Sequence, residues 1–223
     1  HVVSEMWPKF THEGGTGLYW EIISSVYHDE ELWLEGTTFA RALNQFRLQE
    51  ADIMLAIYRT DIDGDDYLRS DSFIDVDYVS VCIRNTSVFP SIGSLKEGVA
   101  TWVVDYGYEF IFDVKDYYEV EDRAKGLQMV AKGRVDFYID AFSEITRQLD
   151  SDTALKAQLT CNIIHEEPLY LAFHNSPQGR KLKSKWEQRF KQLKDSERLQ
   201  MLFTKYGVPY PFNYHQVKKS PAQ

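Results

Sequence analysis

Asp140 is the residue of this chain whose chemistry stands out, because it ends the apolar run "RVDFYID" (residues 134–140). A carboxylate at the end of a predicted buried strand has no evident structural partner in the sequence around it. Burying a charge without a partner is unfavourable, so a desolvated ammonium group needs a fixed carboxylate of this kind. Asp140 is therefore a candidate for binding a cationic or hydrogen-bond-donating group of a small ligand.

Aromatic residues near other predicted strand and helix ends fit a binding cleft of the same kind. Their side chains give wide, rigid contact surfaces, and they can stack on cations or rings. Trp7 precedes Pro8 at the end of a predicted strand, which favours a position facing a cleft. Phe39 lies on the apolar stripe of a predicted helix, so a place in the core is an equally good interpretation. The candidates of this type are Trp7, Tyr19, Phe39, Tyr58, Tyr106 and Tyr108.

Two segments of similar pattern must position these side chains. Phe39–Tyr58 and Val120–Asp140 each predict an amphipathic helix, a turn and an apolar strand that ends in polar or aromatic residues. In open α/β sheets, ligands bind beyond the carboxyl ends of the strands. Two such units in one chain predict two lobes whose crevices face each other, and so a binding cleft rather than a single enzymatic pocket.

Length and composition limit the class of protein. The chain has 223 residues, of which 43% are hydrophobic, so it is long enough for two domains with packed cores. Its net charge of −9 repels phosphate backbones, which argues against nucleic acid as a partner. No apolar run approaches the roughly 20 residues that span a bilayer. The sequence begins at His1 without a secretory signal, as expected of a processed mature protein or a trimmed one.

The two cysteines and the acidic loop suggest no metal or cofactor site. Cys82 and Cys161 either form one disulfide bond or are small buried hydrophobic residues. The segment "DIDGDD" resembles a calcium loop, but the register that puts Gly64 at the sixth position puts Ser70 where a bidentate glutamate is needed. The histidines lack metal-ligand spacing. We therefore expect no metal and no cofactor.

Apolar periodicity predicts an α/β protein whose chain crosses twice between its lobes. Strands are expected at residues 2–6, 31–36, 51–58, 76–84, 134–140 and 166–173, and helices at 17–27, after Thr38, at 120–133 and at 179–206, with Thr16 and Thr38 as N-caps. The economical division puts residues 1–75 and 172–223 in lobe 1 and residues 76–171 in lobe 2, with the two crossings forming a hinge.

The chain resembles the family-3 extracellular solute-binding proteins, the periplasmic receptors of amino-acid-type ABC importers. The matching stretches occur in the family's order: "WPKF", "GTGLYWEI", "FARAL…EADIMLAIYRT", "SIGSLKEGVATWVVDYGYE", "GLQMVAKGRVDFYIDA" and "EPLYLAFHNSPQGRKL…FTKYG". The resemblance implies a type II periplasmic-binding fold. Each lobe would be a mixed, mostly parallel sheet flanked by helices, and the lobes would close around a small solute.

The resemblance also assigns binding positions. Trp7 and Phe39 match the family's cleft aromatics, and residues 57–64 match the segment that grips the α-carboxylate of the ligand. In that segment the usual threonine is Arg59 and the usual arginine is Gly64, which is a departure from the family pattern. Arg59 would supply the guanidinium from a nearby position, or it would pair with the acidic loop 61–71.

In lobe 2 the resemblance places the ligand's amino group at Asp140. The loop that usually presents backbone N–H groups corresponds to residues 105–108, where Asp105 would be a second carboxylate facing a cationic ligand. The expected ligand is a small polar solute, an amino acid or a related amine or carboxylate.

Three functions follow from these expectations. The first is a monomeric periplasmic protein that delivers its solute to an inner-membrane ABC permease. The second is a ligand-sensing module of a signalling system, either the ectodomain of a signalling receptor or a free partner of one. The third is a dehydratase-like enzyme on the same scaffold, with Asp140 and either Asp105 or Glu109 as its acid–base pair. We expect the binding protein and no enzymatic activity.

Overall fold

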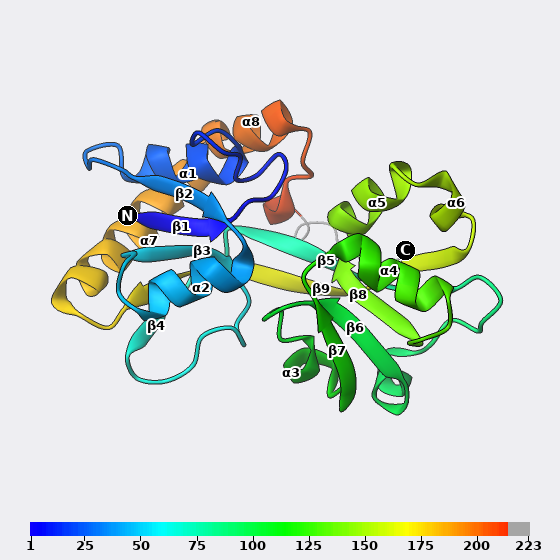
Figure 1. Ribbon diagram of the computed structural model, residues 1–223. Coiled ribbons are helices and arrows are strands. Elements are labelled where there is room, and N and C mark those ends of the chain that lie inside the picture. The colour runs from blue at the N-terminus through cyan, green and yellow to red at the C-terminus, as the bar shows by residue number, and fades with distance from the viewer. Residues whose placement is uncertain (214–223) are drawn as a thin grey trace, which may run out of the picture. The chain divides into compact units, whose positions relative to one another are not determined.

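The computed structural model describes residues 1–213, and the chain divides into two compact units (Figure 1). Unit 1 consists of His1–Asp75 and the chain from Leu169 onward, and unit 2 is Val76–Pro168. The chain passes between the units in β5 (Asp75–Arg84) and again in β9 (Leu159–His174). The second crossing lies before Leu169, whereas the sequence predicted it before Ala172. Residues 214–223 of the predicted lobe 1 lie outside the described residues.

Parallel strands form one side of the sheet of unit 1. Strand β1 (Val2–Glu5) pairs in parallel with β2 (Leu34–Thr37) and β3 (Ile53–Ile57). Strand β9 runs antiparallel to β3, and β4 (Tyr67–Arg69) runs antiparallel to β9. Strands β1 to β4 therefore point in one direction, and the carboxyl ends of β1, β2 and β3 form one edge, which we call the unit 1 edge. The last residue of β4, Arg69, pairs with Ala172, level with Met54 in β3, and its guanidinium reaches this edge over the ring of Tyr170, which pairs with Ile57.

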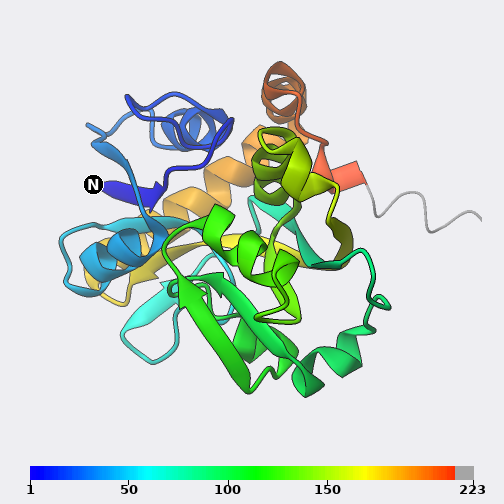
Figure 2. The same ribbon diagram turned by 45° about the vertical axis from the view of Figure 1, so that its right-hand side comes forward.

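Helices cover this sheet because each has one apolar stripe to bury. Helix α2 (Phe39–Arg47) packs against β1, β2 and β3, and the Thr38 side chain accepts a hydrogen bond from the Arg41 N–H, as predicted. Helices α1 (Leu18–Val26), α7 (Pro177–Asp195) and α8 (Glu197–Tyr206) pack against one another; α7 and α8 are orange in Figure 2. Their largest fully buried side chains are Trp20, Trp186, Tyr19, Phe190 and Phe203.

The predicted N-cap at Thr16 is wrong, because α1 begins after Gly17. Gly17 has a φ of 130°, and a Cβ atom there would lie 2.3 Å from the Phe10 carbonyl oxygen. The N–H groups of Leu18 and Tyr19 donate to the carbonyl groups of Lys9 and Phe10. The preceding loop therefore supplies the acceptors that a capping side chain would otherwise provide.

Unit 2 has its own sheet, in the order β5-β8-β6-β7. Strand β6 (Val99–Val103) is parallel to β7 (Asp116–Val120) and to β8 (Phe137–Ala141), and β8 is antiparallel to β5. The carboxyl ends of β6, β7 and β8 form the unit 2 edge. Helix α4 (Arg123–Ala131) packs against all three strands, and α5 (Phe142–Asp150) packs against β8. The short helices are η1 (Ile92–Glu97), α3 (Tyr108–Phe112) and α6 (Thr153–Lys156).

Cys82 and Cys161 form a disulfide bond within unit 2, which decides between the two interpretations of these residues. The bond links β5 to β9 across a sequence separation of 79. Cys82 lies in the same core cluster as Leu127, Val130 and Tyr138, and Cys161 packs against that cluster. The cross-link therefore ties both strands that leave unit 2 to its core.

Several elements were not predicted. Strand β4 lies inside the acidic loop 61–71, and β7 has exposed residues along most of its length, so neither shows an apolar pattern. The predicted helix at residues 179–206 is two helices, because Ser196 is extended and ends α7 just before α8 begins. The last described residues form the short helix η2 (Pro211–Asn213).

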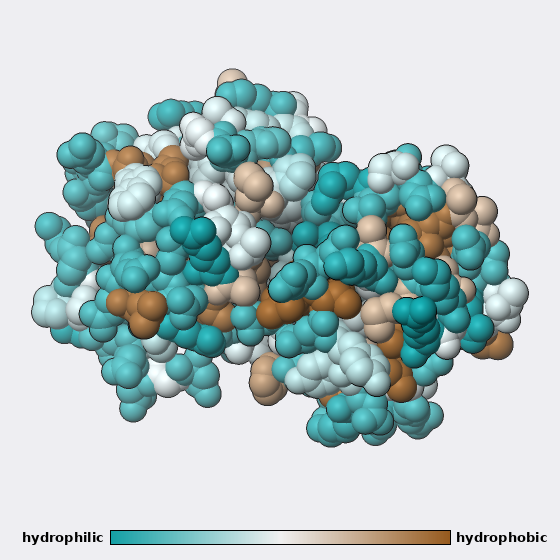
Figure 3. Space-filling view, in the orientation of Figure 1, coloured by the Kyte–Doolittle hydropathy of each residue, from teal (hydrophilic) through white to brown (hydrophobic). Residues whose placement is uncertain are grey.

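Hydrophilic residues cover most of the face shown in Figure 3, and hydrophobic residues form small separate groups on it. Charged residues make up 26% of the sequence, which fits a largely hydrophilic surface. Among residues 1–213 there is no helix with both the length and the hydrophobicity needed to span a membrane.

Candidate functional site

The unit 1 edge brings together side chains that are far apart in the sequence. Trp7 follows β1, Phe39 follows β2, Tyr58 follows β3, and Arg69 is the last residue of β4. Because these strands are parallel, the predicted residues Trp7, Phe39 and Tyr58 lie along one edge, the usual position for ligand contacts in α/β sheets.

Trp7, Phe10 and Tyr19 form an aromatic cluster next to the carboxyl end of β1. The Trp7 ring centroid lies 4.6 Å from that of Phe10, and the Phe10 centroid lies 4.7 Å from that of Tyr19. Trp7 is half-buried and keeps a surface for contact, whereas Tyr19 is completely buried. The Tyr19 hydroxyl donates a hydrogen bond of 2.9 Å to Asp75. The prediction that Tyr19 contacts the ligand therefore disagrees with this structure, where Tyr19 is a packing residue behind Trp7.

Arg59 is exposed and forms no ion pair among residues 1–213. The alternative that Arg59 pairs with the acidic loop is therefore wrong for this structure. Asp61 of that loop instead accepts a hydrogen bond of 2.6 Å from the backbone N–H of Tyr58, which closes the turn after β3. Phe39 and Tyr58 are each only 8% exposed, so both contribute mainly to packing at the edge.

Arg69 is a candidate that the sequence did not reveal. Its guanidinium carbon lies 4.9 Å from the centroid of the Tyr170 ring, a cation–π contact. The Arg69 Nε atom is buried and has no hydrogen-bond partner among the described residues. A buried donor without a partner is rare in native proteins and needs an explanation. Arg69 also lines a cavity of about 300 Å³, together with Ile57, Asp63, Tyr67 and Lys183 among others.

The unit 2 edge is organised around Asp140, which is completely buried. Its Oδ2 atom accepts hydrogen bonds from the Arg123 Nε at 3.0 Å and from the Tyr138 hydroxyl at 2.5 Å. Its Oδ1 atom accepts a hydrogen bond of 2.8 Å from the Ala141 N–H. The premise that Asp140 is an unpaired carboxylate is therefore wrong, because Arg123, the first residue of α4, is its partner.

A second carboxylate extends this ion pair into a network. Glu144, which is buried, lies 2.6 Å from the Arg147 guanidinium and 3.6 Å from the Arg123 Nε. Burial raises the pKa of Asp140, and the Arg123 charge and the Tyr138 hydroxyl oppose this rise. Burial and the nearby Asp140 likewise raise the pKa of Tyr138. Two carboxylates and two guanidinium groups leave the network close to neutral.

The other predicted residues of unit 2 differ in exposure. Tyr106 follows β6, and its hydroxyl accepts a hydrogen bond from Arg123, so this side chain belongs to the Asp140 site. Asp105 is exposed, and its backbone N–H donates to Glu119 at 2.9 Å. Tyr108 is completely buried against Trp102, which makes it a core residue in this structure rather than a ligand contact.

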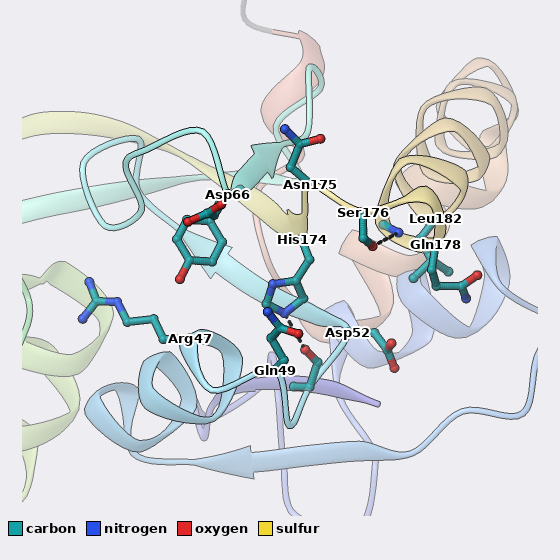
Figure 4. A pocket seen from close by; sticks show the side chains of 12 residues that line it. Arg47, Gln49, Asp52, Asp66, His174, Asn175, Ser176, Gln178 and Leu182 are labelled. Atoms are coloured by element: carbon teal, nitrogen blue, oxygen red, sulfur yellow. Dashed lines mark hydrogen bonds between the residues drawn. The ribbon is translucent and has the colours of Figure 1, made fainter.

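A second cavity in unit 1, of about 420 Å³, lies near the amino end of β3, away from the unit 1 edge (Figure 4). Asp52 at the start of β3, His174 at the end of β9, and Ser176 and Gln178 at the start of α7 line it. The His174 Nε2 lies 3.0 Å from the Ala51 carbonyl oxygen, and Ser176 caps α7. No group of three His, Cys, Asp or Glu side chains in residues 1–213 could hold a metal ion.

Solved structures share this architecture. A substrate-binding protein of an amino-acid ABC transporter superimposes with a TM-score of 0.69, at 15% identity, over 92% of this chain and 97% of that chain. The chain has the type II periplasmic-binding-protein fold. GshT of Streptococcus mutans, described in connection with glutathione import, matches with a TM-score of 0.69 and 15% identity over 94% of this chain and 95% of that chain.

A third match is a histidine kinase sensor domain with similarity to periplasmic binding proteins, with a TM-score of 0.71 and 15% identity over 94% of this chain and 96% of that chain. No protein-family model matches the sequence, and no curated protein matches it. The comparisons therefore confirm the predicted fold class, which this chain shares with the substrate-binding proteins of amino-acid importers.

Proposed function

We propose that the protein captures a small polar solute and is not an enzyme. The solute would bind between the two units, to residues of the unit 1 edge and the unit 2 edge, and hinge closure at the two chain crossings would enclose it. The observation that carries this proposal is Arg69, whose buried Nε lacks a partner at the end of a strand in a fold used by binding proteins. Trp7, Phe39, Tyr58, Arg59, Asp105, Tyr106 and Asp140 are proposed to line or support the cleft.

Ligand binding would drive the closure of the hinge. Open and closed states of a hinge protein differ by a few kcal/mol, and a ligand that contacts both units shifts the equilibrium towards the closed state. The unit 1 edge offers a guanidinium and aromatic surface, which suit a carboxylate with a short carbon chain. The disulfide supports an extracytoplasmic location, because such bonds persist in oxidising compartments.

A thermal-shift screen against small carboxylates, amino acids and amines tests the proposed function directly. A ligand at a hundred times its dissociation constant stabilises the folded protein by about 2.7 kcal/mol, which raises its melting temperature measurably. Absence of a shift with every compound of the three classes would contradict the proposal.

Replacing Arg69 by glutamine is expected to weaken binding of the solute found in that screen by roughly tenfold to a hundredfold. The reason is that a hydrogen bond to a charged group contributes about 1.5–3 kcal/mol. Isothermal titration calorimetry of the two proteins measures the change. Arg198→Gln, an exposed position on α8 of the same unit, is the matched control and should bind normally. A loss of affinity in Arg59→Gln but not in Arg69→Gln would assign the anion site to Arg59 instead.

Two roles are compatible with solute capture. Delivery to an inner-membrane ABC permease is the first, and the substrate-binding proteins of the same fold support it. Ligand sensing is the second, and the similarity to a histidine kinase sensor domain favours it. A pull-down of detergent-solubilised membrane proteins with the loaded protein separates them, because it would recover either a permease or a sensor protein.

The third expected function, a dehydratase-like activity, has little support in the site. Its acid–base pair needs Asp140 to exchange protons, yet Asp140 is buried between Arg123 and Tyr138, and Asp105 is exposed. Glu109 accepts a hydrogen bond of 3.2 Å from the Tyr117 hydroxyl through Oε1, while its buried Oε2 has no hydrogen-bond partner among the described residues. We therefore propose binding without turnover.

A further inference from the structure

We propose that the solute is a small carboxylate that carries no ammonium group. This inference rests on the proposed function, and it names the chemical class of the ligand. It follows from how the charged side chains are paired. The Asp140 carboxylate at the unit 2 edge forms an ion pair with Arg123, whereas the Arg69 guanidinium at the unit 1 edge forms no ion pair and its buried Nε has no hydrogen-bond partner among the described residues.

The first step concerns Asp140, the carboxylate expected to bind an ammonium group. None of its surface is exposed, and its two oxygens accept hydrogen bonds from Arg123, Tyr138 and Ala141. An ammonium group would have to displace Arg123 in order to reach it. That exchange would remove Arg123 from Asp140, from Tyr106 and from the vicinity of Glu144. Breaking a buried ion pair in this way is strongly unfavourable.

The second step concerns two other carboxylates at the unit 2 edge, Asp105 and Glu119. Both are exposed, so an ion pair that either forms with an ammonium group is screened by water and contributes little. Removing the ammonium group from water costs more than such a pair returns. An ammonium group on the ligand therefore gains no binding free energy at the unit 2 edge.

The third step concerns Arg69 and the charges around it. Of the other charged residues that line its cavity, Lys183 is paired with Asp71 at 2.7 Å, and Asp63 is exposed. Among the described residues the Arg69 guanidinium forms a cation–π contact with Tyr170 and no ion pair, and its Nε has no hydrogen-bond partner. A ligand carboxylate would accept a hydrogen bond from the buried Nε and form an ion pair with the Arg69 guanidinium.

The test uses matched pairs of compounds that differ only in the 2-amino group. Acetate and glycine, propionate and L-alanine, succinate and L-aspartate, and glutarate and L-glutamate are titrated into the native protein by calorimetry. We expect at least one carboxylate to bind, and to bind at least tenfold more tightly than its amino partner. Arg69→Gln should weaken that binding at least tenfold, and the Arg198→Gln control should retain it.

Each other outcome overturns the inference. Tighter binding of an amino acid than of its deaminated partner would show that an ammonium site exists, and it would leave the proposed function intact. No binding by any of the eight compounds would also contradict the inference. In that case the wider thermal-shift screen decides the proposed function separately, since that screen includes amines and other amino acids.

Discussion

Arg123→Gln is expected to lower the free energy of unfolding by about 3–5 kcal/mol at neutral pH, because it leaves one member of a buried ion pair without its partner. Asp140 is completely buried, and glutamine cannot supply the compensating charge. The Arg123 charge is also the strongest influence that lowers the pKa of Asp140, so its removal raises that pKa further. Urea unfolding of the native and variant proteins measures the difference.

The pH dependence of this defect provides a second readout. In the unfolded chain Asp140 titrates near its ordinary pKa of about 3.9, whereas burial raises its pKa in the folded native protein and the loss of Arg123 raises it further in the folded variant. The folded variant therefore binds the proton more tightly than its unfolded chain, and its stability falls as the pH rises through that interval. We expect the gap between native and variant proteins to be largest at neutral pH and to shrink towards pH 4.

The matched control is Arg147→Gln, which removes the other guanidinium of the network. The Arg147 side chain is 50% exposed, and the buried Glu144 that remains still lies 3.6 Å from the Arg123 Nε, so the expected loss is smaller than in Arg123→Gln. Equal losses in the two variants, or a gap in Arg123→Gln that does not change with pH, would contradict the assignment of Arg123 as the partner that lowers the pKa of Asp140.

Loss of the Cys82–Cys161 bond is expected to lower the stability of the protein by about 2–4 kcal/mol. The bond closes a long loop, with a sequence separation of 79, and so restricts the unfolded chain. The double variant Cys82→Ser/Cys161→Ser, compared with the native protein by thermal unfolding, measures the effect. Unit 2 should be affected most, because both cysteines and the core cluster around them belong to it.

Reducing agent gives the control for this experiment. It should lower the melting temperature of the native protein to about that of the double serine variant, and it should leave the variant unchanged. A native protein whose melting temperature is the same with and without reducing agent would show that the bond contributes no stability, or that it is absent in solution.

The α/β fold class was predicted from local patterns and is confirmed by the structure. The apolar run at residues 51–58 became β3, and Thr38 caps α2 as expected. Such features depend on neighbouring residues, because side-chain periodicity and capping act over a few positions. Strand β4 escaped prediction because its three residues are held by pairing with β9, about a hundred residues away in the sequence.

Trp7, Phe39 and Tyr58 were recognisable as candidates because a residue that follows a parallel strand lies at the carboxyl edge in any open α/β sheet. The sequence by itself thus determined which segments form elements and which residues lie at strand ends. Only the tertiary structure decided how the charges are paired. Arg123, the first residue of α4, reaches Asp140 in β8, and Arg69 of β4 contacts the Tyr170 ring on the neighbouring strand β9. Charge pairing depends on distances between segments remote in sequence, which no local pattern encodes.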